Sequence, residues 1–168
     1  MHLWQLGMAR AAWLAAHAAL APLLAQACTL ELREHRSERP VARIALDQAA
    51  PRFSIAFEHS VLGTTVVDTY AVRNTAGAHS IWLTEERFSG EGYGLPYSAL
   101  APHEALQREQ DGWRLTLNRL VNPLVVRPLP AQQMRLVVAT QTWRLADWGI
   151  NNQQLALEFV GSGCTSNG

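Results

Sequence analysis

Three side chains are the first candidates for chemistry, because His59, Ser60 and Asp68 supply the imidazole, hydroxyl and carboxylate that nucleophilic hydrolysis uses. His59 and Ser60 are adjacent on a predicted strand, where successive side chains point to opposite faces. They cannot share a hydrogen bond unless a bulge or the strand end intervenes, and the chain contains no Gly-x-Ser-x-Gly turn. A hydrolase is therefore disfavoured, and the remaining enzymatic interpretation has His59 as a general base oriented by Asp68.

The second candidate is the segment 90–96, which reads Gly-Glu-Gly-Tyr-Gly-Leu-Pro. Alternating glycines give the backbone access to positive φ and let another group approach closely. The segment is not a phosphate loop, because it lacks the Lys and the Ser or Thr that follow in a P-loop. It is either a wide connection between sheets or a loop that faces a ligand or partner through Glu91 and Tyr93.

Metal and nucleic-acid binding are both disfavoured by the composition. The histidines that follow the first 27 residues are far apart, and no pair such as His-x-His or Cys-x-x-Cys occurs, so the sequence predicts neither a metal site nor a cofactor. Fourteen arginines balance fourteen acidic residues, lysine is absent, and no basic stripe is present that could follow phosphates. Nucleic acid is therefore not an expected partner.

The elements that must position these residues are β-strands. Apolar residues recur with period two in short runs, which is typical of strands with one buried face. In 52–59 the apolar residues share a face with His59, which places His59 on the core side. The pattern predicts one all-β domain, an antiparallel β-sandwich or partly open barrel, with 97–110 as a short helix or long loop. About nine strands are expected, at 29–34, 41–46, 52–59, 66–73, 80–85, 112–118, 124–127, 133–139 and 154–160.

Residues 1–27 have the form of a secretory signal peptide, and the all-β domain is expected to occupy 28–168. Arg10 precedes an apolar run at 11–24, and Ala25-Gln26-Ala27 has the small-x-small form of a cleavage site. The run is shorter than the roughly 20 apolar residues that span a bilayer. We expect an exported, periplasmic protein, which would be membrane-bound only if the signal stays uncleaved or Cys28 carries a lipid, as in a lipoprotein.

The two cysteines, Cys28 and Cys164, lie near opposite ends of the expected domain. An oxidising compartment would permit an intramolecular disulfide that joins these ends. The alternatives are that both cysteines lie on frayed termini and stay unpaired, or that they pair with another chain.

Three motifs follow one another along the chain, at 57–61, 66–70 and 88–96. This ordered set resembles the DUF1850 family of small exported bacterial proteins. Phe-Glu-His-Ser-Val at 57–61 is similar to the family's strand ending in His-Ser, and Val-Val-Asp-Thr-Tyr at 66–70 is similar to its next strand. The segment 88–96 resembles its Phe and Gly-x-Gly-Leu-Pro loop. The pairs Asp111-Gly112 and Asn118-Arg119 follow where the family has comparable pairs, and the resemblance covers 28–138.

This resemblance implies an association with tripartite, ATP-independent periplasmic (TRAP) transporters of the TAXI type, beside whose components such proteins are often encoded. It brings no established activity. The leading hypothesis is a non-enzymatic periplasmic accessory or binding module that contacts a transporter component or a small solute. It would use the strand end at 59–60, the loop from Glu91, and Arg87 and Arg119, whose charges suit a solute carboxylate. The alternative is a small periplasmic enzyme that uses His59 as general base with Asp68.

Overall fold

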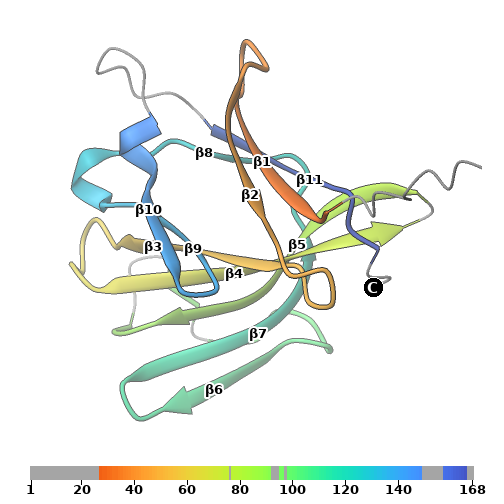
Figure 1. Ribbon diagram of the computed structural model, residues 1–168. Helices are drawn as coiled ribbons and strands as arrows, with labels where there is room; N and C mark the ends of the chain where they lie inside the picture. Colours follow the sequence, from red (N-terminus) through yellow and green to blue (C-terminus); the bar gives the residue numbers. More distant parts are fainter. Residues whose placement is uncertain (1–26, 76, 92–94, 97, 149–156, 166–168) are drawn as a thin grey trace, which may run out of the picture.

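The computed structural model describes residues 27–75, 77–91, 95–96, 98–148 and 157–165, and these form a predominantly β domain (Figure 1). Eleven strands make two antiparallel sheets, of four and seven strands, and the only helical segments among these residues are the short 3-10 turns Pro130–Gln132 and Leu145–Trp148. The predicted all-β sandwich is confirmed, with two more strands than expected and without closure into a barrel. No helix in the described part of the chain is long and apolar enough to cross a membrane.

The smaller sheet has the strand order β2-β1-β11-β8. Its strands are β1 (Thr29–Glu34), β2 (Pro40–Ala45), β8 (Leu124–Val126) and β11 (Leu157–Ser162). The larger sheet has the order β10-β9-β3-β4-β5-β7-β6. Its strands are β3 (Arg52–Glu58), β4 (Thr65–Thr75), β5 (Ala78–Phe88), β6 (Ala105–Glu109), β7 (Gly112–Leu120), β9 (Arg135–Val138) and β10 (Gln141–Arg144).

A disulfide between Cys28 and Cys164 joins the start of β1 to the end of β11, which confirms the predicted intramolecular bond. Both cysteines are buried. The two strands they flank pair with each other over the whole of β1, so the bond and the sheet hold the same two ends of the domain together. Within this structure the Cys28 sulfur is therefore not available to carry a lipid.

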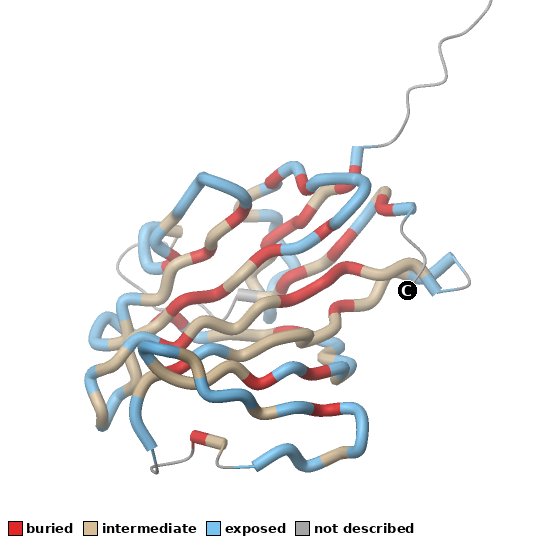
Figure 2. Tube along the Cα trace, turned by 90° about the horizontal axis from the view of Figure 1, so that it is seen from below, coloured by how far each residue is buried: buried red, intermediate tan, exposed pale blue. Residues whose placement is uncertain are grey.

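Two apolar clusters fill the fold, and they divide the larger sheet between them. The main cluster lies between the sheets and includes Leu32 and Phe159 from the smaller sheet with Ile55 from the larger one. The second cluster, which includes Val66 and Leu115, lies toward β7 and β6, the strands farthest from the smaller sheet (Figure 1). Buried positions alternate with more exposed ones along part of β7 and along β9, as the period-two pattern predicts, whereas β1 and β4 each have three consecutive buried residues (Figure 2).

Strand β1 has the predicted bounds, whereas β6 and β10 were not predicted. The segment 97–110 was expected to hold a short helix or long loop, and within it the structure has the strand Ala105–Glu109. Both unpredicted strands are edge strands with mostly exposed residues, so they carry no apolar alternation that a sequence could show. The last predicted strand, at 154–160, corresponds to β11, and its first three residues lie outside the described residues.

Candidate functional site

The candidate site lies on the inner face of the larger sheet, the face that carries the main cluster. On β4 the residues of this face are Val66, Asp68, Tyr70 and Val72, so a carboxylate stands in an otherwise apolar or aromatic row. Asp68 is opposite Ile55 on β3 and opposite Glu86 on β5. Two acidic side chains therefore face each other across adjacent strands, in a position where like charges destabilise a sheet.

A β-bulge in β5 brings Glu86 to this face. In the pairing of β4 with β5, Tyr70 is opposite Leu83 but Thr69 is opposite Glu85, so Thr84 is the extra residue. The Thr84 hydroxyl donates to the backbone oxygen of Thr69 at 3.1 Å. One extra residue reverses which side chains point inward, because side chains alternate along a strand. Leu83 points inward before the bulge, and Glu86 points inward after it.

Asp68 is the most strongly perturbed carboxyl group of the site. Its Oδ1 atom is buried and has no hydrogen-bond partner, and its Oδ2 accepts a bond from the Tyr70 hydroxyl at 3.3 Å. Burial, followed by the nearby charge of Glu86, raises the pKa of Asp68 to about 7, while the Tyr70 hydrogen bond acts in the opposite direction. Burial also raises the pKa of Glu86, which the nearby Arg119 charge partly offsets. Asp68 can therefore hold or release a proton near neutral pH.

Arg119 and Glu104 complete the site, which we call the inner-face cluster: Asp68, Tyr70, Glu86, Glu104 and Arg119. Arg119 donates two bonds to Glu104, from Nε at 2.6 Å and from Nη2 at 2.8 Å. The Glu104 side chain is only 2% exposed, and the hydrogen bond from Arg119 is the main cause that lowers its pKa to about 2. The cluster therefore contains one hydrogen-bonded ion pair beside two facing acids, one of which has an oxygen without a partner.

His59 does not lie in the core, so its predicted place was wrong. β3 ends at Glu58, and the alternation of faces ends with it. The half-exposed ring of His59 accepts bonds at Nδ1 from the backbone N–H groups of Val61 and Leu62, at 3.3 and 3.2 Å, and so holds the β3–β4 turn. Ser60 is exposed in the same turn.

The pairing of His59 with Asp68 that the enzymatic alternative requires is not formed. The His59 N–H donates to the Thr64 oxygen at 2.8 Å, which fixes His59 opposite Thr64. Asp68 is four residues farther along β4, a separation of about 13 Å in a strand. Each of the two side chains also has other hydrogen-bond partners.

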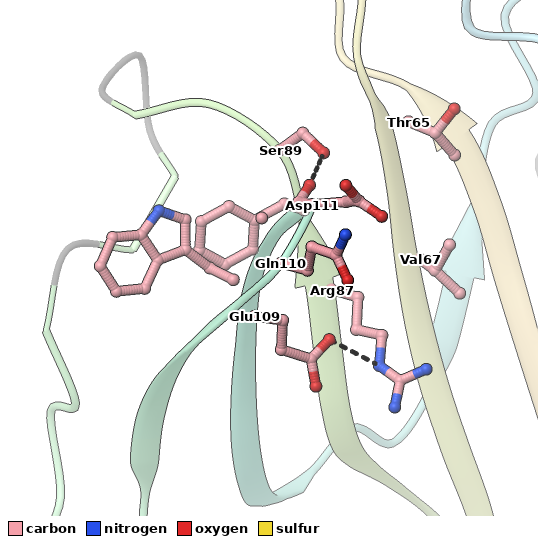
Figure 3. A pocket seen from close by; sticks show the side chains of 10 residues that line it. Thr65, Val67, Arg87, Ser89, Glu109, Gln110 and Asp111 are labelled. Carbon is pink, nitrogen blue, oxygen red and sulfur yellow. Dashed lines mark hydrogen bonds and ion pairs between the residues drawn. The ribbon is translucent and has the colours of Figure 1, made fainter.

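The remaining predicted residues are spread over the domain. Arg87 points to the outer face, where it lines a cleft near Glu109 (Figure 3). Glu91 is exposed and lies 3.6 Å from Arg108 in an ion pair. Tyr93 lies outside the described residues. Of the predicted site residues, the structure thus brings only Asp68 and Arg119 into one cluster.

Three members of the inner-face cluster were missed, namely Tyr70, Glu86 and Glu104. Glu86 follows Glu85 in a strand, and a sequence does not show which of two adjacent acids points inward when a bulge lies beside them. Glu104 lies in a segment that was expected to be a helix or loop. The available signal was the spacing of Asp68 and Tyr70, which places a carboxylate and a phenol on one strand face.

No group of three or more His, Cys, Asp or Glu residues that could hold a metal ion occurs within the described ranges. The groups that the site offers to a ligand are carboxyl oxygens, a phenol and a guanidinium. The carboxyl groups can exchange a proton or accept hydrogen bonds, the phenol can donate or accept, and the guanidinium can only donate. The two apolar clusters on either side of Asp68 limit access of water.

Comparison with known proteins identifies the family of the chain. No curated protein and no solved structure matches it. The family model DUF1850, described as a domain of unknown function, matches residues 53–145. This range runs from the second residue of β3 to just past β10, so it covers nearly the whole of the larger sheet. The match begins later and ends later than the resemblance at 28–138 suggested. Because it covers more than half of the 168 residues, the chain belongs to the DUF1850 family.

Proposed function

We propose that this domain is a non-enzymatic binding module that works outside the cytoplasm as an accessory to a TRAP transporter of the TAXI type. The observation that carries the proposal is the unsatisfied Asp68 oxygen, which faces a second acid, Glu86, on the inner face of the larger sheet. Buried polar groups normally have hydrogen-bond partners, yet the Asp68 Oδ1 atom has none. Natural folds retain such local costs mainly at functional sites.

The contrast between the two halves of the inner-face cluster supports a binding role. Glu104 has a structural role, because its carboxylate accepts two hydrogen bonds from the Arg119 guanidinium. Asp68 faces another acid, Glu86, and a purely structural role would be better served by an apolar residue or an amide. The acid pair is suited to accept hydrogen bonds from a donor group on a solute or a transporter component.

The expected carboxylate-bearing solute does not fit Arg119 of the inner-face cluster. Arg119 already binds Glu104 with two of its nitrogens, so a solute carboxylate would have to displace the buried carboxylate of Glu104. We therefore place the donor group of the ligand, rather than an acid, at Asp68.

Export to an oxidising compartment is supported by the disulfide. Disulfides persist mainly in secreted and periplasmic proteins, and the bond between Cys28 and Cys164 closes almost the whole domain. The expected signal peptide lies outside the described residues apart from Ala27. Mass spectrometry of the exported protein tests both the disulfide and the cleavage of the signal peptide, because a lipoprotein would carry the mass of lipid on Cys28.

The transporter association is tested by co-purification of the tagged protein from its native host. The comparison is wild type against Asp68→Asn, which removes the charge with little change of shape, with Asp47→Asn as the matched control in an exposed turn. We expect wild type and the control to recover TRAP transporter subunits and Asp68→Asn to recover at least several-fold less. Failure of the folded wild type to recover any subunit, after chemical cross-linking in cells, would remove the proposal.

A further inference from the structure

A cleft on the outer face of the larger sheet is separate from the inner-face cluster. It has a volume of about 320 Å³, which lies within the usual range for small-molecule sites. Thr65 and Val67 of β4 form one wall, and the hairpin between β6 and β7, at Gln110 and Asp111, forms the other, with Arg87 of β5 between them (Figure 3).

Arg87 has free donors in this cleft. Its two ion-pair contacts, to Glu85 at 3.1 Å and to Glu109 at 3.8 Å, both use Nε. Its terminal Nη groups make no hydrogen bond within the described residues, and the side chain is 51% exposed. A guanidinium that keeps its Nη groups free is suited to bind a carboxylate through two parallel bonds.

Asp111 supplies the opposite charge. Its carboxylate has no hydrogen bond or ion pair in the described part of the chain, whereas its backbone oxygen accepts a bond from the Ser89 hydroxyl at 2.8 Å. The next residue, Gly112, has a φ of 155°, and a Cβ there would lie 2.3 Å from the Phe88 oxygen. This close approach fixes the hairpin against the end of β5 and so fixes the position of Asp111 relative to Arg87.

We propose that the outer cleft binds a small zwitterion that carries both a carboxylate and a primary ammonium group. The carboxylate binds the Nη groups of Arg87, and the ammonium binds the carboxylate of Asp111. Val67 gives an apolar surface for the carbon atoms between the two charges, and the Gln110 amide lies between Arg87 and Asp111 (Figure 3). Binding here requires no transporter, so this proposal and the proposed accessory role can be tested independently.

Calorimetric titration of the purified protein tests the proposal with a series in which only the charge separation changes: glycine, 3-aminopropanoate, 4-aminobutanoate and 5-aminopentanoate. Butanoate and butylamine carry one charge each. We expect at least one zwitterion to bind saturably. Each single-charge compound should bind at least about tenfold more weakly, because the loss of one charge-assisted contact weakens binding by about that factor or more.

The variants Arg87→Gln and Asp111→Asn are each expected to weaken the best zwitterion by at least about tenfold. Their matched controls are Arg144→Gln and Asp47→Asn, at exposed positions on other parts of the domain, and these should bind as wild type does. Thermal unfolding confirms that each variant is folded, and amide NMR shifts at Ser89 and Gly112 place the ligand in the wild type. The proposal is overturned if no member of the series saturates by about 10 mM, if butylamine or butanoate binds as tightly, or if neither variant changes the affinity.

Discussion

Replacement of Asp68 by Asn should change how the stability of the domain depends on pH. The pKa of Asp68 is raised from 3.8 to about 7 in the folded chain, mainly by burial and next by Glu86. The folded chain therefore binds this proton more tightly than the unfolded chain. Full ionisation of Asp68 costs the folded state about 4 kcal/mol relative to the unfolded state, at about 1.4 kcal/mol for each pKa unit.

The sign of the effect follows from where the proton is bound. Between about pH 4 and pH 7 the folded state holds more protons than the unfolded state, so the free energy of unfolding falls as the pH rises through this window. Asn is neutral at every pH and lacks this cost. The stability of Asp68→Asn relative to wild type should therefore increase by about 4 kcal/mol between about pH 4 and pH 8, whatever the packing cost of the amide.

Urea unfolding of both proteins at several pH values, followed by circular dichroism, measures this difference. Asp47→Asn is the control for the loss of one exposed carboxylate. Carbon-13 NMR of the Asp68 carboxyl gives its titration directly, and Glu86→Gln should lower the pKa of Asp68, because the charge of Glu86 is a cause of the shift. If the stability difference between Asp68→Asn and wild type is equal at pH 4 and pH 8, the reasoning about burial of Asp68 is wrong.

Three further predictions concern the fold around the site. Reduction of the bond between Cys28 and Cys164, which are 136 residues apart, should lower the free energy of unfolding by about 5 kcal/mol in the chain-entropy picture, and an unchanged urea midpoint in reductant would contradict this. Gly161→Ala should cost about 1 to 3 kcal/mol, since its Cβ would lie 2.3 Å from a methyl carbon of the buried Val72, and a melting temperature equal to that of wild type would show that the sheets can separate there. Glu104→Gln should destabilise the domain at neutral pH, because the pKa of Glu104 is lowered to about 2. The stability that this carboxylate contributes is present above about pH 4.5 and is lost as the pH falls toward 2. The free energies of unfolding of wild type and variant should therefore converge in acid-unfolding curves.

Local sequence patterns predicted most of the strands, because alternation of apolar and polar residues depends only on which face of a strand is buried. The bounds of β1 and the first residue of β3 follow directly from this pattern. The pattern gave a wrong position for His59, because alternation of faces holds only within a strand. His59 follows the last residue of β3, so its ring turns to the backbone of the β3–β4 turn instead of continuing the inward face.

The sequence by itself determined the all-β class and placed Asp68 in a predicted strand, since both depend on residue type and local spacing. It permitted the bond between the only two cysteines, which the structure then showed. Only the tertiary structure decided what Asp68 faces. The bulge at Thr84 turns Glu86 inward beside it, and the folding of β6 and its preceding loop against β7 brings Glu104 to Arg119. The physical reason is that burial, charge neighbours and hydrogen-bond partners arise from contacts between distant segments, and a one-residue change of register is enough to exchange them.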